Sequence, residues 1–364
     1  MPLCPPRPHR LRALAHLLTV MACGLTLSSF SGCALPTSLA PRPATQPWEA
    51  RATVPVVNAL RPDDPPGRGW DLHHPSLRFG GLSGITLPPP LPADPPGRQA
   101  LLAVSDRGAL VRFFLRADGS PDPETLPVVT PLTGPDLQPV LRNDLRDAEE
   151  ITALPDGTLL ISFEQKHRLW AYGPDPATPP VPVPLPDDFG TVPNNRGIEA
   201  MAVHPDGRLL LVQEDHITGP NGTDELRGWV GTPEPGAPLH YRWKSRRIAA
   251  SGSFDVSGAT VLPSGAVLLV ERDWDFPLTF ITRVRRLGPS VWEDSNGVLD
   301  GPEVFRLSTP DLQENYESVV VLPAASGADA DRRVLILSDN NFLNMQKTLL
   351  LDIGRSADLD GSWR

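Results

Sequence analysis

Cysteine is almost absent from this chain. Of the 364 residues only three are cysteines, Cys4, Cys23 and Cys33, and none follows residue 33. The main part of the chain therefore cannot contain a disulfide, a thiolate nucleophile or a zinc site with cysteine ligands. A chain of this length can be stabilised by its core alone, so the absence of disulfides is compatible with an exported protein.

Positive charge is also scarce. The sequence has 33 Lys and Arg residues against 43 Asp and Glu residues, which gives a formal net charge of -10. Proteins that bind nucleic acid contact its phosphates through basic patches, so nucleic acid is excluded as an expected partner. The same excess of carboxylates favours a divalent cation as a partner.

Several well-known functional motifs are missing. The chain has no P-loop, no Rossmann glycine pattern and no His-Glu-x-x-His sequence. The segment Gly81-Leu82-Ser83-Gly84-Ile85 lacks the final glycine of a Gly-x-Ser-x-Gly nucleophile elbow. Nucleotide binding, zincin chemistry and an α/β-hydrolase serine are therefore not expected.

Helical periodicity is hard to find as well. The 45 Pro and 30 Gly residues break the chain into short apolar runs that are bounded by Pro, Gly and Asp, as is typical of strands. The sequence therefore predicts an all-β protein.

The N-terminus has the features of an export signal. Arg7, Arg10 and Arg12 precede an apolar stretch at residues 17–30, which is too short for a comfortable membrane span. Phe30-Ser31-Gly32-Cys33 resembles a bacterial lipobox, in which Cys33 becomes the lipidated first residue. Cleavage before Cys23 and a plain cleaved signal are the alternatives.

These features predict three parts of the chain: a signal peptide at residues 1–32, a Pro-rich tether at 33–48 and one domain at 49–364. Cleavage would remove three Arg and no acidic residue, so the net charge would change from -10 to -13. Ala34, not Asp, follows Cys33, which favours the periplasmic face of the outer membrane. Contact with the membrane is expected only through the lipid anchor.

A repeat runs through the rest of the sequence. In each copy an acidic residue or a serine opens a short apolar run, a turn follows, and a second apolar run ends on a carboxylate. The five copies run from Ser83 to Asp106, Glu149 to Glu164, Glu199 to Glu214, Ser257 to Glu271, and Glu317 to Asp339. Repeats of this length are typical of propellers and solenoids.

The turns set the geometry of each copy. Asp156-Gly157 and Asp206-Gly207 lie midway between the first and last residues of their repeats, where a hairpin should turn. The two end residues of each hairpin should then lie side by side, far from the turn. Blades arranged around a channel would bring these ends to one mouth. A single acid at a strand end is usually solvated. Here, however, acids recur at the same position of each repeat, and this recurrence favours a shared acidic mouth.

Carboxylates are therefore the chemistry that the sequence offers. Acids packed together repel one another, and a hard cation such as calcium relieves the repulsion through oxygen ligands. The candidate ligands are the carboxylates at the repeat ends: Asp106, Glu164, Glu214, Glu271 and Asp339. The candidate catalytic residues are Glu149, Glu199, Glu317, His167, Arg168 and Arg107. His216 is expected to be exposed.

Six segments resemble a known family in the order in which that family has them. They are Phe79-Gly80-Gly81-Leu82-Ser83-Gly84, Ser105-Asp106-Arg107-Gly108, Asp147-Ala148-Glu149-Glu150-Ile151, Ser162-Phe163-Glu164, Gly197-Ile198-Glu199-Ala200 and Ser338-Asp339-Asn340-Asn341-Phe342. Over about residues 75–355 the chain resembles the phytase-like family named for the esterase-like activity of phytase. The resemblance implies a β-propeller that hydrolyses small-molecule esters or phosphoesters. The chain has Glu150 and Ser318 where that family commonly has glycine.

We therefore expect one β-propeller of five or six blades, with six favoured because spare strands at residues 52–60 and 348–353 could complete a sheet. Two functions remain open. One is an exported, cation-dependent ester or phosphoester hydrolase, and the other is a non-catalytic propeller that binds a ligand or protein at the cell envelope. A His or Arg close to the acids, such as His167, Arg168 or Arg107, would favour hydrolysis.

Overall fold

The computed structural model describes residues 42–43, 48–75, 79–140, 142–173, 178–190, 192–275, 279–294, 297–324 and 326–361. The predicted signal peptide and Cys33 lie outside the described residues. Contacts between Cα atoms group residues 39–364 into one compact unit. No helix in the described part of the chain is long and apolar enough to cross a membrane.

The described residues form five sheets, numbered here as blades 1 to 5. Blade 1 has the order β1 (Arg42–Pro43), β7 (Val128–Pro131), β6 (Ala109–Leu115), β5 (Gln99–Ser105), β4 (Leu82–Thr86). Blade 2 has β11 (Val181–Val183), β10 (Arg168–Tyr172), β9 (Leu159–Phe163), β8 (Ala148–Ala153). Blade 3 has β12 (Ile198–Val203), β13 (Leu209–Thr218), β14 (Asp224–Glu234), β15 (Ala237–Ala249), β19 (Val298–Leu299).

Blade 4 has β16 (Asp255–Val261), β17 (Val267–Asp275), β18 (Thr279–Leu287) and β20 (Glu303–Arg306). Blade 5 has β2 (Glu49–Ala52), β3 (Arg68–His73), β23 (Leu349–Arg355), β22 (Arg333–Asp339) and β21 (Asn315–Val321). The helical elements are short: α2 (Asn143–Arg146), α3 (Ser356–Leu359), η1 (Pro289–Trp292), η2 (Pro310–Leu312) and η3 (Asp329–Asp331).

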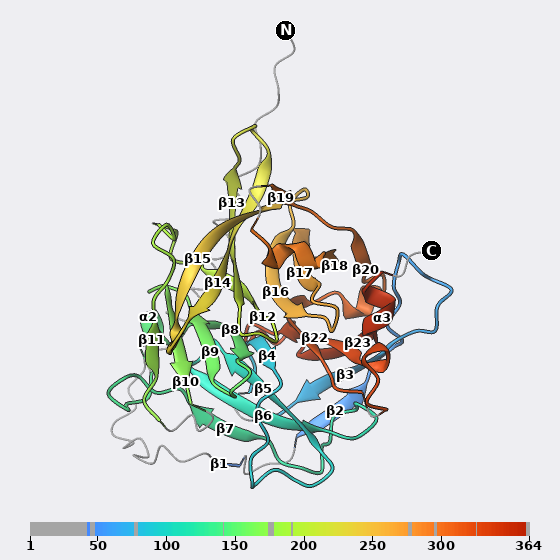
Figure 1. Cartoon of the computed structure of the whole chain (residues 1–364). Coiled ribbons are helices and arrows are strands. Elements are labelled where there is room, and N and C mark those ends of the chain that lie inside the picture. Colours follow the sequence, from blue (N-terminus) through green and yellow to red (C-terminus); the bar gives the residue numbers. More distant parts are fainter. Residues whose placement is uncertain are drawn as a thin grey trace. The chain divides into compact units, whose positions relative to one another are not determined.

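The five blades close into a ring. The innermost strands are β4, β8, β12, β16 and β21; each packs against the next, and β21 packs against β4. Figure 1 labels the first four of them near the centre of the ring. The fold is therefore an all-β, five-bladed propeller, as the repeat predicts. The preference for six blades is corrected, because the strands at both ends of the domain join β21 and β22 in blade 5. Closure by strands from both ends is confirmed, but the N-terminal strands are Glu49–Ala52 and Arg68–His73, and residues 53–60 form only isolated bridges at Val56 and Asn58 instead of the predicted strand.

The core lies between neighbouring blades. Strands such as β9 and the first half of β13 are buried on both faces, as their continuous apolar runs predict. Their side chains form five apolar clusters, one at each of the five interfaces between blades. Each blade is thus held by two neighbours, and the ring can position side chains from all five blades at its ends.

The N-terminal segment joins the first and last blades. Residues Arg42–Pro43 pair with β7 in blade 1, whereas Glu49–Ala52 pairs with β3 in blade 5. Between them Trp48 is only 2% exposed, packs against Phe79 and Phe113, and donates its indole N–H to the carbonyl of Thr125 at 2.9 Å. The fold therefore begins before residue 49, within the segment that the sequence assigns to the tether.

Candidate functional site

Every blade has an irregularity at the same place. The pairing of the two innermost strands shifts register at Ser83, at Glu149 and Glu150, at Glu199, at Ser257 and at Glu317. A β-bulge redirects a side chain out of the regular alternation and is common beside functional sites. All five bulges lie at the first residue of a repeat. They therefore redirect the side chains of these five opening positions at the same end of the ring.

The last residues of the repeats lie beside these bulges; β5, β9 and β22 end there, whereas β13 and β17 continue beyond them. The backbone N–H groups of Asp106, Glu164 and Glu214 donate to the backbone carbonyls of Gly81, Asp147 and Gly197, respectively, at 2.8 to 3.1 Å. In blade 5 Asp339 pairs with Asn315, just before the bulge. Glycine turns at 157 and 207, with positive φ, close the far ends of the hairpins, as the Pro-Asp-Gly sequences predict.

Together these positions form what we call the acidic ring. Its members are Asp106, Asp147, Glu149, Glu164, Glu199, Glu214, Glu317 and Asp339. Carboxylate oxygens of Asp147, Glu149 and Glu164 lie within 4.8 Å of one another, and so do those of Glu164, Glu199 and Glu214. The two groups share Glu164, so blades 2 and 3 present a continuous set of acidic oxygen atoms that could hold a metal ion.

Glu271 is not part of the acidic ring, which corrects the sequence prediction. Its carboxylate is buried on the other face of β17 and accepts hydrogen bonds from the Nε atoms of Arg283 at 2.7 Å and Arg285 at 2.9 Å. The equivalent position in blade 4 is Arg272, which pairs with Asp255 in the same way that Asp339 pairs with Asn315. Glu149 and Glu164 are 15 residues apart, and the residue 15 positions after Ser257 is Arg272. This spacing is the sequence signal that identifies Arg272 as the equivalent position.

Arg272 introduces a positive charge among the acids. Its Nη1 atom donates to Asn315 Oδ1 at 2.6 Å and to Glu317, and its Nη2 atom lies 3.7 Å from Glu214 Oε1. The ring is therefore asymmetric: Arg272 contacts Glu214 of one carboxylate group, whereas in the described part of the chain it forms no ion pair with Asp147, Glu149 or Glu164.

Sequence reasoning also missed Asp147. This residue precedes β8 by one position, and its backbone carbonyl and carboxylate both face the end of β9, where Gln165 donates to Oδ2 at 3.3 Å. The available signal was its place two residues before Glu149 in a segment already singled out. The repeat does not mark Asp147, because this residue precedes the first strand of its copy.

The acids perturb one another strongly. Burial away from water, followed by the charge of Asp147, raises the pKa of Asp106 to about 7. Burial likewise raises the pKa of Glu164 to about 8 and that of Glu214 to about 7. Burial and neighbouring carboxylates also raise the pKa values of Glu149, Glu199 and Asp339 well above their ordinary range. Crowding of this kind is relieved by protons or by a cation.

The predicted basic partners lie around this ring but point in different directions. His167 Nε2 lies 3.0 Å from the carbonyl of Pro193, its Nδ1 is buried without a hydrogen-bond partner, and burial lowers its pKa. Arg168 donates to the backbone carbonyls of Lys166 and Leu145. The guanidinium of Arg107 stacks 3.3 Å from the ring centre of Phe342.

His216 differs from its sequence prediction. Its side chain is 20% exposed and lies between the carboxylates of Asp224 and Asp255, at 3.1 and 3.3 Å. The hydrogen bond to Asp255 is the largest cause that raises the pKa of His216 to about 9. It is therefore a paired side chain rather than an exposed one, and it extends the polar network outward from Glu214.

Comparison with known proteins gives one family match. The model of the phytase-like family, described as "Esterase-like activity of phytase", matches residues 77–342 and so includes every member of the acidic ring. No curated protein matches the chain.

Three solved structures illustrate the similarity at the level of the fold. A gluconolactonase from Xanthomonas campestris is 14% identical, with 89% of this chain and 100% of that chain covered and a TM-score of 0.39. A luciferin-regenerating enzyme is 13% identical, with 79% and 84% covered and a TM-score of 0.42. An α-L-arabinofuranosidase from Podospora anserina is 12% identical, with 85% and 98% covered and a TM-score of 0.42. Their substrates carry no argument for this chain.

Proposed function

The chain belongs to the phytase-like family, and from this premise we propose that it is a divalent-cation-dependent hydrolase of small esters or phosphoesters. The observation that supports the proposal best is the pair of carboxylate groups that share Glu164. Carboxylates this close raise one another's pKa values, and a bound cation relieves their repulsion at neutral pH in place of protons.

The donor set fits a hard cation. All the side-chain oxygens in the two groups are carboxylate oxygens, which calcium, magnesium and manganese prefer over nitrogen or sulfur. In the neighbouring blade 1, Asp106 Oδ1 is buried without a hydrogen-bond partner, and the charge of Asp147 raises the pKa of Asp106. The residues that would hold the ion are Asp147, Glu149, Glu164, Glu199 and Glu214, and we propose calcium. When bound, such an ion polarises a carbonyl or phosphoryl oxygen and lowers the pKa of a coordinated water.

Residues outside the two groups supply the remaining functions. Arg272, held by Asn315 and Glu317, offers a cationic contact for an anionic part of the substrate. Asp106, whose pKa is raised to about 7, is suited to accept a proton from water near neutral pH. Arg107 lies next to Asp106 and its charge lowers that pKa, so it tunes the proposed base.

The proposal is tested by assaying the purified protein on carboxyl esters and phosphoesters, first with calcium, magnesium or manganese and then with chelator. We expect activity only with the cation, and a loss of at least about 100-fold in the Glu199→Gln variant. The control is Glu124→Gln. The Glu124 side chain is 78% exposed and lies in the connection between β6 and β7 of blade 1. Hydrolysis that survives chelation unchanged would exclude the cation from the reaction.

A second function has its own supporting observation. The two basic side chains that follow Glu164, His167 and Arg168, are directed at backbone carbonyls rather than at the acidic ring. A cation-loaded ring without a general acid would bind a ligand or protein without turnover. Calorimetry that detects calcium binding, together with no hydrolysis of any compound in the panel, would favour this alternative.

We further propose that the protein acts outside the cytoplasm, anchored through a lipid on Cys33. The support is the sequence of residues 7–33, with its basic, apolar and lipobox-like parts in order. Mass spectrometry of the mature N-terminus tests this proposal, because a diacylated Cys33 is expected there and a free N-terminus at any other residue would refute it.

A further inference from the structure

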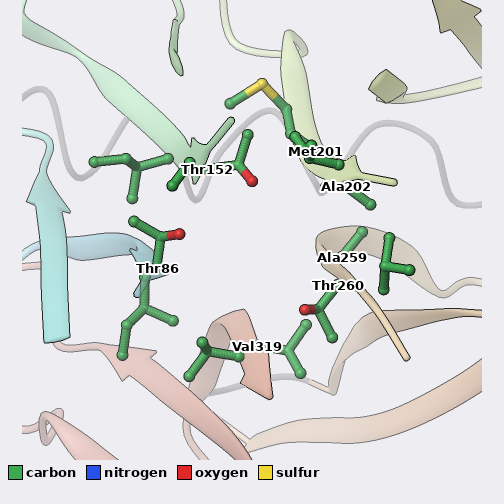
Figure 2. A pocket seen from close by; sticks show the side chains of 13 residues that line it. Thr86, Thr152, Met201, Ala202, Ala259, Thr260 and Val319 are labelled. Carbon is green, nitrogen blue, oxygen red and sulfur yellow. The ribbon is translucent and has the colours of Figure 1, made fainter. Parts of the chain in front are cut away.

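A substrate at the acidic ring has little room along the axis of the propeller. The axial cavity has a volume of about 110 Å³, which is smaller than the roughly 150 Å³ cavity that holds one benzene molecule. Figure 2 shows Thr86, Thr152 and Thr260 around this cavity. The buried Glu150 precedes the cavity residue Ile151 in β8 and so lies between the acidic ring and the cavity. The part of a substrate that does not react must therefore lie on the rim, by which we mean the loops at the mouth.

The rim over blades 3 and 4 is polar. His216 of β13 lies between the carboxylates of Asp224 and Asp255, at 3.1 and 3.3 Å. On the same strand, Asp215 Oδ1 lies 3.4 Å from Arg196 Nη1. A hydrocarbon group placed here would take these charged groups out of water, which costs free energy. This part of the rim is therefore unsuited to an apolar group.

The rim over blade 5 is different. The connection between β22 and β23, residues 340–348, is called here the blade 5 loop, and it begins directly after Asp339 of the acidic ring. Leu343 is 37% exposed and Met345 is 71% exposed, so this loop holds two of the six large apolar side chains that the described residues expose. The other four lie in the connection between β2 and β3, in β11 and in β19: Val54, Leu60, Val181 and Val298. Methionine adapts its shape to different apolar partners. The exposed apolar surface of the described rim is therefore concentrated in the blade 5 loop.

The blade 5 loop reaches the proposed base, Asp106. A Cβ atom added at Gly81 would lie 2.3 Å from Phe342 Cε2 and 2.4 Å from Asp106 Oδ1, so the aromatic ring and the carboxylate are neighbours over a position where only glycine fits. Asp106 Oδ1 is buried without a hydrogen-bond partner. The guanidinium of Arg107 stacks on the ring of Phe342 at 3.3 Å from its centre. The apolar surface is therefore continuous with the acidic ring.

Hydrogen bonds fix the conformation of the blade 5 loop. Asn340 Oδ1 accepts the backbone N–H groups of Gly81 in blade 1 and of Phe342, each at 3.0 Å. Asn341 Nδ2 donates to Gln346 Oε1 at 3.0 Å. Asn341 and Phe342 have φ angles of 47° and 52°, in the left-handed region that is costly for residues with a side chain. A loop held in this way pays little ordering entropy when a ligand binds.

We propose that the blade 5 loop is an apolar subsite, which binds the uncharged hydrocarbon part of the substrate through Phe342, Leu343 and Met345. The inference rests on the proposed hydrolase function and narrows its substrate class to carboxyl esters with an extended aliphatic or aromatic group, in preference to small or highly charged phosphoesters. The hydrocarbon part lies over blades 5 and 1, and the ester group lies over the carboxylates of blades 2 and 3.

The first test is a chain-length series. The 4-nitrophenyl esters of acetate, butyrate and octanoate are assayed with calcium, and we expect kcat/KM of wild type to rise about twofold for each added methylene group, because an open rim removes part of each group from water. The double variant Leu343→Ser, Met345→Ser should flatten the series. The matched control is Val181→Ser, which changes an exposed valine of β11 and should keep the wild-type slope. A flat series in wild type, or an unchanged slope in the double variant, would overturn the proposal.

The second test does not depend on hydrolysis. N-phenyl-1-naphthylamine is a neutral dye that fluoresces in apolar surroundings, and its titration measures binding to the same three proteins. We expect the double variant to bind it at least about fivefold more weakly than wild type and Val181→Ser do. If no ester is hydrolysed but dye binding falls in this way, the hydrolase function fails and the apolar subsite stands. If esters are hydrolysed but all three proteins bind the dye equally, the hydrolase function stands and the subsite is refuted.

Discussion

Chelation should destabilise this protein, and the effect should grow with pH. Glu164 has a folded pKa of about 8, raised from 4.5 mainly by burial. Because an unfolded chain releases this proton near pH 4.5 while the folded chain holds it until about pH 8, stability is lost as pH rises through that window. One pKa unit corresponds to about 1.4 kcal/mol, so the loss through Glu164 alone is at most about 5 kcal/mol.

A bound cation should oppose this loss. An ion that binds only the folded state at a hundredfold excess over its dissociation constant stabilises it by about 2.7 kcal/mol. We therefore expect little difference between calcium and chelator at pH 5 and a large difference at pH 8. Urea unfolding at both pH values, each with calcium or chelator, measures the free energy of unfolding directly. Subtracting the free energy of unfolding in chelator from that in calcium at each pH isolates the contribution of the acidic ring. Pairs such as His216 with Asp255 contribute equally to both measurements and cancel.

Variants sharpen the test. Glu199→Gln removes one charge from the crowded group, so in chelator at pH 8 it should be more stable than wild type and should respond less to calcium. Glu124→Gln, on the exposed surface, should behave as wild type does. The reasoning is refuted if chelator leaves the wild-type free energy of unfolding unchanged at pH 8, or if the chelated protein is more stable at pH 8 than at pH 5.

Other substitutions separate structural from functional charges. Arg272→Leu should lower the free energy of unfolding by about 3–5 kcal/mol, because it leaves Glu317 without its buried partner; urea unfolding measures the loss. Glu271→Gln should destabilise by a similar amount through Arg283 yet leave the calcium affinity per folded molecule unchanged in calorimetry. Trp48→Ala should cost about 3–5 kcal/mol of unfolding free energy, measured in the same way, because it empties the contact between blades 1 and 5.

Local signals account for most of what the sequence predicts about the fold. The Pro-Asp-Gly turns specify hairpins through the dihedral preferences of Pro and Gly, and these hairpins form as predicted. The number of blades depends instead on which distant strands pair. The strand Leu349–Arg355 looks the same in sequence whether it starts a sixth sheet or joins blade 5.

The acidic ring was predictable only in part. Spacing alone marks Arg272, whereas residue type favours Glu271, which lies one residue earlier and therefore on the opposite face of its strand. The role of Glu150 could not be predicted at all. Its carboxyl group is buried and lies beside Gly84 of blade 1, and only ring closure brings the two blades together there.

The composition of blade 5 has a kinetic consequence. Its strand β3, near the start of the fold, pairs with β23 near the end, so that Asp71 lies opposite Leu349. Contacts between such distant residues carry a high loop-closure entropy and slow the rate-limiting step of folding. Blade 2, the first four strands of blade 3 and the first three strands of blade 4 can each form from continuous chain. The ring cannot close until the residues around 350 have been synthesised. Until then the apolar edges beside blade 5 remain open, and the growing chain is at its most vulnerable to aggregation and proteolysis.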